Sequence, residues 1–358
     1  MFLLYVVFLF LILRFTVTLF NFISNPKLTL SGKHYDDLVS ILIPESNEDY
    51  DVLTLLQSIH SQDYKNLEVL IAATDKPLLN PGYTAIDSRF KIIAKPDLPA
   101  GWSDKNFSYY ILSKAAKGKY LLFLDPRTII ANGLINNAVN RMKIQRLTLL
   151  SLFTNQLMLS FGERLVVPLI NYLLLNLVPL RLIRLSKNAV FSISSGQFMM
   201  FDAQTYNQHE WHEVAKTNRE DSNELMRLVK SWGYHAEVLL ANGYIYSRLY
   251  TGFSTSIQGL SRNIITHFGS ITALFIYIFL VILGPVAIGL YMGAELLLFA
   301  ITLIVLSRIM TSLASGQNPW LNIILHPVQM LSLVLISVLS VQQYYTKPVN
   351  RHSNKMRF

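Results

Sequence analysis

The chain contains no cysteine and few charged residues, and both absences narrow its class. Without cysteine, a disulfide framework, a thiolate zinc site and a catalytic thiol are excluded. Charged residues make up 15% of the 358 residues and hydrophobic residues 52%, whereas ordinary soluble domains are about 25% charged. This composition argues against a disordered chain, a coiled coil and a purely soluble protein. The length favours two structural units.

Phosphate-binding loops of the common kinds are also missing. The sequence has no Walker-type G-x-x-x-x-G-K-[ST] motif and no G-x-G-x-x-G motif. The chain is therefore neither a P-loop NTPase nor a dinucleotide-binding enzyme with the usual G-x-G-x-x-G fingerprint.

Long apolar runs stand at both ends of the chain. Residues 1–24 carry one charge, Arg14, and no small-residue cleavage site follows them, so we expect a retained transmembrane anchor. Residues 266–346 carry only Glu295 and Arg308. Since a crossing needs about 20 apolar residues, this stretch fits three helices. We expect them near 268–290, with a kink at Gly284-Pro285, and near 293–313 and 320–341.

The net charge of +9 is confined to particular segments. Residues 141–187 hold seven basic residues and one acid, whereas 25–140 and 188–265 each have a net charge of −1. This distribution does not indicate nucleic-acid binding. Within the basic segment, 165–187 is apolar, is interrupted by prolines and asparagines, and ends in cations. We expect it to lie at the interface of an anionic membrane surface; a buried helix or a fourth crossing is the alternative.

An α/β unit is predicted between the apolar ends. Continuous apolar runs at 39–44, 67–72, 90–94 and 120–124 alternate with helical spacing at 51–60 and 106–116, which is typical of a parallel sheet with crossover helices. Ligands of such sheets bind beyond the carboxyl ends of the strands. Polar or charged residues stand at three of those ends, at 44–48, 74–76 and 125–127. Each group alone is typical of a turn, but together they favour a nucleotide site.

Several motifs, in order and spacing, resemble a known family. They are ILIPESNE (41–48), GWSDK (101–105), YLLFLDPR (120–127), SGQ (195–197) and the stretch 219–234. The chain resembles the membrane-bound family 2 glycosyltransferases, most closely the hopene-associated and diaponeurosporenoate (carotenoid-acid) branch and more distantly ceramide glucosyltransferase. The resemblance implies a GT-A domain, a Rossmann-like nucleotide-diphospho-sugar transferase fold, over 25–265. It implies inverting transfer of a hexosyl group from a nucleotide-diphosphate sugar, usually a UDP-sugar, to a membrane lipid acceptor of glycolipid, isoprenoid or carotenoid type.

The resemblance also implies roles for single residues of the donor site. Pro44 and Glu48 would line the nucleotide pocket, and Asp75 would hold the base. Lys105 would lie near the diphosphate. Asp125 matches the first carboxylate of the family's D-x-D motif, which contacts the ribose and a divalent cation, Mn²⁺ or Mg²⁺.

Asp221 matches the family's catalytic base. A single displacement needs one carboxylate to accept the proton of the acceptor hydroxyl, and the apolar spacing of 225–232 places Asp221 at a helix N-terminus, where the helix dipole stabilises a carboxylate. A plain N-cap is the alternative role. The neighbouring Glu220, with Gln258 and Arg262 further along, would contact the acceptor or the diphosphate.

Arg127 is the main departure from the family pattern, because it stands where the second D-x-D carboxylate is expected. A guanidinium does not ligate a cation. Three explanations remain: Asp125 and the donor phosphates hold the metal alone, Arg127 supplies positive charge to the leaving group, or the donor site is inactive. The last would make the chain a non-catalytic glycosyltransferase-like membrane protein.

The expected location is the cell membrane, with several crossings and with 25–265 in the cytosol. Three late crossings would put the basic tail, 347–358, outside, against the positive-inside tendency. A re-entrant segment within 266–346 would return this tail to the cytosol.

Overall fold

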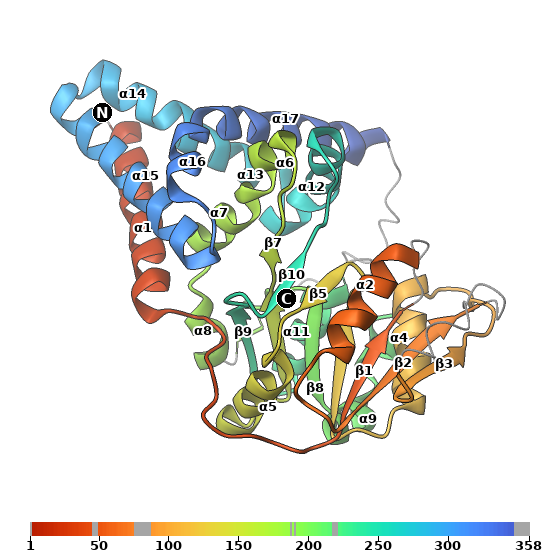
Figure 1. Cartoon of the computed structure of the whole chain (residues 1–358). Helices are drawn as coiled ribbons and strands as arrows, with labels where there is room; N and C mark the ends of the chain where they lie inside the picture. The colour runs from red at the N-terminus through yellow and green to blue at the C-terminus, as the bar shows by residue number, and fades with distance from the viewer. Residues whose placement is uncertain are drawn as a thin grey trace. The chain divides into compact units, whose positions relative to one another are not determined.

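The predicted strands form in the computed structural model, which describes residues 2–44, 49–74, 87–186, 188–189, 191–216 and 221–346. The chain divides into two compact units. An α/β unit comprises 26–155 and 180–247, and a helical unit comprises 2–25, 156–179 and 248–346 (Figure 1). The predicted basic tail lies outside the described residues.

Seven strands form the main sheet of the α/β unit, in the order β3-β2-β1-β4-β8-β6-β9. All are parallel except β8, which is antiparallel to both of its neighbours. The strands are β1 (Val39–Ile43), β2 (Leu67–Ala73), β3 (Phe90–Ala94), β4 (Tyr120–Leu124), β6 (Leu149–Phe153), β8 (Phe198–Asp202) and β9 (Ala236–Leu240). The four runs read from the sequence are β1 to β4, and this prediction is confirmed. Short strands β5 (Thr128–Ile130) and β10 (Ile245–Ser247) pair antiparallel, and β7 is Asn155–Gln156.

Helices pack on the sheet because its central strands are apolar on both sides. All residues of β1, β2 and β4 are buried, as expected for parallel strands with covered faces. Leucines and isoleucines of α2 (Asp49–His60) and α5 (Leu134–Gln145) join one core cluster with these strands. On α4 (Asp104–Ala115), Tyr109 packs edge-on against Phe123 of β4. The structure describes four more helices in this unit: α8 (Leu180–Leu185), α9 (Ala203–His209), α10 (Trp211–Val214) and α11 (Asp221–Ser231).

Four helices of the helical unit are long and apolar enough to cross a membrane. They are α1 (Phe2–Ser24), the continuous segment 271–291, α15 (Ala294–Ser315) and α17 (His326–Thr346). The segment 271–291 consists of α13 (Ile271–Ile278), a π-helical turn η2 (Phe279–Leu283) and α14 (Gly284–Tyr291). The π-helical turn directly precedes the Gly284-Pro285 pair, where proline lacks the N–H that a regular helix needs. A helix of crossing length forms near each of the four predicted stretches. The last one starts at His326 and not near 320, because residues 319–324 form a separate short helix.

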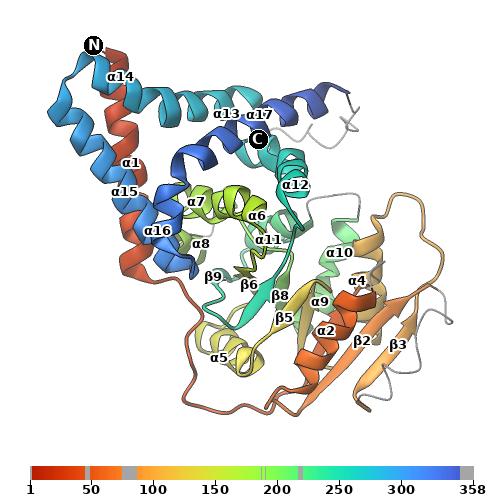
Figure 2. The ribbon, with the colours of Figure 1, turned by 45° about the horizontal axis from the view of Figure 1, so that its top comes forward.

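Shorter helices pack among the long ones. They are α6 (Phe161–Val166), α7 (Pro168–Leu177), α12 (Phe253–Phe268) and α16 (Pro319–Ile324) (Figure 2). Helix α7 contacts both α1 and α15, and the amide of Asn21 donates to the carbonyls of Leu175 (2.9 Å) and Val178 (2.8 Å). The side-chain amide of Asn21 is therefore satisfied by α7 inside this unit.

The segment 165–187 divides between the two units after Pro179. Helix α7 is largely buried in the helical unit. In the α/β unit, Arg181 and Arg184 of α8 lie 3.5 and 3.2 Å from the buried carboxylate of Glu237. Attachment of this segment to an anionic membrane surface stays a prediction.

Candidate functional site

Asp125 directly follows β4, at the carboxyl edge of the sheet where a ligand was expected. Asp125 is buried, with 4% of the residue exposed. Its backbone N–H donates to the carbonyl of Gln197. The hydroxyl of Thr128 donates to the Asp125 carbonyl at 2.7 Å. Tyr109 of α4 donates to the carbonyl of Leu124 at 3.0 Å. The backbone of Leu124 and Asp125 is therefore held in place by hydrogen bonds from neighbouring side chains.

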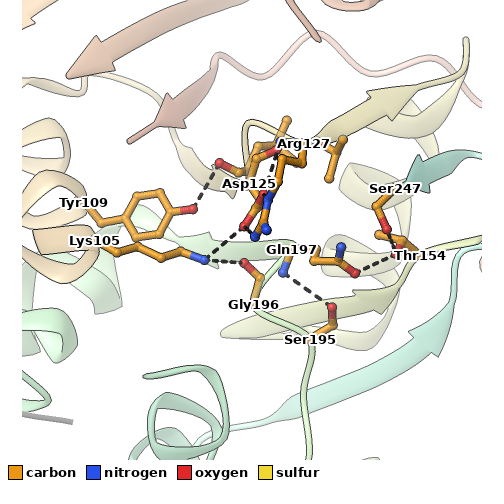
Figure 3. A network of polar contacts seen from close by, with 11 residues as sticks. Lys105, Tyr109, Asp125, Arg127, Thr154, Ser195, Gly196, Gln197 and Ser247 are labelled. Atoms are coloured by element: carbon orange, nitrogen blue, oxygen red, sulfur yellow. Dashed lines mark hydrogen bonds and ion pairs between the residues drawn. The ribbon is translucent and has the colours of Figure 1, made fainter. Parts of the chain in front are cut away.

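Two cations converge on this carboxylate (Figure 3). Arg127 donates from Nε to Oδ1 at 3.0 Å and from Nη2 to Oδ2 at 3.1 Å. Lys105, on the first turn of α4, donates from Nζ to Oδ2 at 3.3 Å and to the carbonyl of Gly196 at 3.4 Å. The side chains of Arg127 and Lys105 are 45% and 39% exposed, so they present positive charge to solvent while the acid stays covered.

Burial alone would raise the pKa of Asp125, but the charge of Lys105 and the hydrogen bonds and charge of Arg127 outweigh it and lower the pKa to about 2. The acid is therefore ionised throughout the physiological range. With one anion facing two cations, the cluster keeps an excess positive charge. Such an excess at the carboxyl edge of a parallel sheet suits an anionic ligand such as a diphosphate.

The Ser195-Gly196-Gln197 loop joins this cluster to the start of α11. A Cβ placed on Gly196 would lie 3.4 Å from Cβ of Ser222 and 3.8 Å from Nζ of Lys105. The carboxamide oxygen of Asn223 accepts from the backbone N–H of Ser194 at 2.8 Å. Helix α11 begins at Asp221, so its N-terminus lies at the same loop as Lys105. The side chain of Asp221 is outside what the structure describes.

A buried polar chain continues from Gln197 to the second, small sheet. Thr154 donates to Oε1 of Gln197 at 2.6 Å, and the Thr154 and Ser247 hydroxyls are 2.7 Å apart (Figure 3). Gln197 was recognised only as part of the SGQ motif, and Thr154 and Ser247 were missed. No local pattern marks them, because their partners lie 43 and 93 residues away in the sequence.

His212 is buried among aromatic side chains close to Lys105. Its ring packs 4.6 Å from that of Phe123 and shares a 2.7 Å hydrogen bond with the hydroxyl of Tyr206. Burial, with a smaller contribution from the charge of Lys105, lowers the pKa of His212 to about 3. The imidazole of His212 is therefore neutral and packs as an aromatic ring next to the cluster.

The other predicted site residues fall into three groups. Pro44 is buried directly after β1. Glu48, Asp75 and Glu220 lie outside the described residues, so their roles stay predictions. Gln258 and Arg262 are exposed on α12 of the helical unit, where Gln258 contacts Ser254 of its own helix, and their contact with an acceptor or diphosphate also stays a prediction.

A divalent cation does not fit the described donor set. Both oxygens of Asp125 accept from guanidinium or ammonium groups, and a guanidinium near a metal ion repels it. Within the described ranges, no three His, Asp or Glu side chains are grouped to hold a metal ion. Asp125, the predicted metal ligand, is thus engaged by protein cations.

No protein-family model matches the sequence, and no curated protein matches it. Among solved structures, the mannosyltransferase PcManGT from Pyrobaculum calidifontis, in complex with GDP-Man and Mn²⁺, aligns with a TM-score of 0.52 at 12% identity, covering 96% of this chain and 100% of its own. S. aureus TarS 1–349 in complex with UDP aligns at a TM-score of 0.42 and 15% identity, covering 78% of this chain and 92% of its own. The first likeness shows a glycosyltransferase fold; the second is too distant to add to it.

Proposed function

We propose that the chain is a membrane-bound, inverting glycosyltransferase of family 2 type with a GT-A domain. It transfers a hexosyl group from a nucleotide-diphosphate sugar to a lipid acceptor. The observation that carries the proposal is the Lys105–Asp125–Arg127 cluster at the carboxyl edge of the parallel sheet, with the N-terminus of α11 at the adjoining loop. The likeness of the fold to that of a mannosyltransferase supports the same proposal.

The chemistry follows from the charges. The acceptor hydroxyl oxygen attacks the anomeric carbon, the bond from that carbon to the diphosphate oxygen breaks, and the nucleoside diphosphate leaves with the bonding electrons. Asp221 takes the hydroxyl proton, since the helix N-terminus favours its ionised form. Lys105 and Arg127 stabilise the negative charge that develops on the leaving diphosphate. Asp125 holds these two cations in place.

A lipid acceptor is supported by the helical unit. Its four apolar helices keep the catalytic unit at a bilayer, and a soluble acceptor would not require such an attachment. In this arrangement the donor site of the α/β unit faces the cytosol, where nucleotide sugars are available.

The test is sugar transfer by the full-length chain in membranes. Membranes carrying the natural chain are supplied in turn with radiolabelled UDP-glucose, UDP-N-acetylglucosamine and GDP-mannose, and both label in organic-extracted lipid and released nucleoside diphosphate are measured. We expect label in lipid from at least one donor. Asp221→Asn should lower that transfer at least about a hundredfold, within the usual contribution of a general base, without weakening donor binding.

Asp202→Asn is the matched control. Asp202 also stands at a helix N-terminus, where its carboxylate accepts from the N–H of Thr205 at 3.0 Å. In the sheet it is the register partner of Tyr120, the first residue of β4, and therefore lies at the end of β4 opposite to Asp125. Asparagine caps a helix about as well as aspartate, so transfer should be unchanged. Donor binding without transfer in the natural chain would favour the non-catalytic alternative, and transfer unaffected by Asp221→Asn would remove the base assignment.

A further inference from the structure

The helical unit contains an apolar pocket with two polar side chains in its wall. The pocket has a volume of about 500 Å³ and is formed by residues of η2, α14, α15, α16 and α17. This volume is in the range of about 300–1,000 Å³ that is usual for small-ligand sites. Its lining is aliphatic apart from Arg308 and His326.

Arg308 is 1% exposed and has neutral partners only. Its Nε donates to the carbonyl of Asn322 at 3.4 Å, and its Nη2 donates to the carboxamide oxygen of Gln329. Its guanidinium carbon lies 4.5 Å from the centre of the Tyr172 ring. These contacts fix the orientation of the guanidinium but do not neutralise its charge.

No acid is available nearby to compensate this charge. In the sequence of the helical unit, the only carboxylates are Glu163 and Glu295. Glu163 pairs with Arg248 at 2.8 Å. Glu295 is in the first turn of α15, and 13 residues of helix separate it from Arg308 by about 20 Å. Among the described residues, Arg308 therefore has no ion-pair partner.

A second buried cation increases the imbalance. Arg14 is 5% exposed and donates to the amide oxygen of Asn176 at 3.3 Å, again a neutral partner. Its guanidinium carbon lies 5.2 Å from the same Tyr172 ring. Two buried guanidinium groups around one ring, without a counter-ion, are costly in an apolar unit.

His326 adds a polar atom to the same pocket. It lines the pocket at the start of α17, and its Nδ1 is buried without a hydrogen-bond partner. A buried nitrogen without a hydrogen-bond partner destabilises the folded protein, and a ligand oxygen that accepts a hydrogen bond from it would offset this cost.

We propose that this pocket binds a membrane lipid with a single acidic head group. The acid lies against the Arg308 fork, which suits a carboxylate or phosphate, with His326 as a second contact, and the lipid chain lies along the aliphatic wall. The site goes beyond the proposed sugar transfer, because it requires neither a nucleotide nor that the bound lipid be the acceptor.

The test measures lipid binding to the purified full-length chain in maltoside detergent, without nucleotide sugar. The probes are radiolabelled palmitate and hexadecyl phosphate, with hexadecanol as the uncharged control. We expect saturable binding of at least one acid, about tenfold or more tighter than hexadecanol, the usual effect of a charge-assisted hydrogen bond. The arm that binds identifies carboxylate or phosphate as the preferred head group.

Matched variants separate the site from general stability. Arg308→Gln should weaken acid binding about tenfold or more, whereas Arg14→Gln, which removes the same charge outside the pocket lining, should weaken it far less. Val305→Phe should block the pocket, and Val338→Phe, on an exposed part of α17, should not. If Arg308→Gln does not fold, the valine pair decides.

Equal binding of hexadecanol and the acids would overturn the proposal, as would unchanged acid binding in folded Arg308→Gln or Val305→Phe. A chain that binds acids but transfers no sugar would keep this proposal and refute the proposed function.

Discussion

The guanidinium of Arg127 lies against the carboxylate of Asp125, two residues earlier in the chain, with one nitrogen on each carboxylate oxygen. Arg89 and Asp87 form the same i, i+2 arrangement just before β3, with Nε of Arg89 3.0 Å from Oδ1 of Asp87. The local geometry is thus not unique to the site. Arg127 differs from Arg89 in its position at the carboxyl edge of the sheet, where it shares the carboxylate of Asp125 with Lys105.

Arg127→Gln should lower sugar transfer about tenfold or more, since the leaving diphosphate loses a charge-assisted contact. The loss should appear mainly as a higher KM for the donor if the contact forms on binding, and in kcat if it strengthens in the transition state. Arg89→Gln is the control, because it breaks the same local contact away from the site. Initial rates over a range of donor concentration decide, and equal rates for the two variants would contradict the role of Arg127.

Transfer by the natural chain should persist in EDTA, because protein cations occupy the oxygens of Asp125. Arg127→Asp restores two carboxylates at i and i+2, and we expect its activity to depend on added Mn²⁺. Rates with EDTA and with Mn²⁺ are measured for both proteins. A strict metal requirement in the natural chain would refute the charge-replacement role.

Lys105→Gln should also lower transfer about tenfold, with partial recovery in Lys105→Arg, because an arginine keeps the charge on α4. Lys114→Gln is the control: Lys114 lies on the same helix, two and a half turns on, and pairs with Glu210. Donor affinity measured by displacement of a labelled nucleotide sugar separates the two positions. Similar affinities for the two glutamine variants would remove Lys105 from the donor site.

The sequence predicted the elements whose signal is local. Runs such as 120–124 are continuously apolar because both faces of a parallel strand are covered, so β1 to β4 could be located within one or two residues. Strand β8 was not recognised, because its place between β4 and β6 depends on pairing with residues 48 to 82 positions away in the sequence. Residues 165–187 appeared as one apolar segment, although the two units share it. The cations that follow Pro179 were interpreted as its membrane-facing end, because the sequence does not reveal that Arg181 and Arg184 pair with Glu237, more than 50 residues away.

The same distinction holds for the site. Asp125 and Arg127 follow a recognisable strand, and Lys105 follows a recognisable Gly-Trp pair, so all three were predicted. Their mutual contact was not, because Lys105 reaches Asp125 only after α4 packs on the sheet. The contact of Arg127 with Asp125 depends on the turn after β4, and the residue types alone do not specify it.

Asp125→Asn should destabilise the chain. The pKa of Asp125 is lowered from an ordinary value of 3.8 to about 2, which corresponds to about 2 kcal/mol. Because the pKa is lower in the folded state, this stability is present above about pH 4 and is lost as the pH falls through about 2. The difference in Tm between the natural chain and Asp125→Asn, measured in detergent, should therefore be larger at pH 7 than at pH 3.

Asp97→Asn is the control for this measurement. Asp97 is exposed in the loop between β3 and α4, and surface substitutions of this kind usually change stability by no more than about 0.5 kcal/mol. Its Tm should stay close to that of the natural chain. A Tm difference for Asp125→Asn that does not shrink on acidification would mean that packing, and not charge, causes the loss.

Glu237→Gln should be among the most destabilising single changes in the α/β unit. Glu237, on β9, is 1% exposed and faces three cations: Arg141 at 2.6 Å, Arg181 and Arg184. Removing one partner of a buried ion pair costs about 3–5 kcal/mol, and here the loss leaves like charges together. Arg181 and Arg184 belong to α8, so the change should also loosen the packing of α8 on β9.

Glu224→Gln provides the comparison, because Glu224 pairs with Arg227 three residues along the exposed side of α11, where such a pair contributes about 0–1 kcal/mol. Thermal unfolding in detergent and limited proteolysis near 180–187 measure the two effects. We expect a large fall in Tm and faster cleavage for Glu237→Gln alone. Retained stability in that variant would mean that Arg141, Arg181 and Arg184 find other anions when Glu237 is neutral. Lipid head groups are the natural source, since the segment 165–187, which contains Arg181 and Arg184, was predicted to lie at an anionic membrane surface.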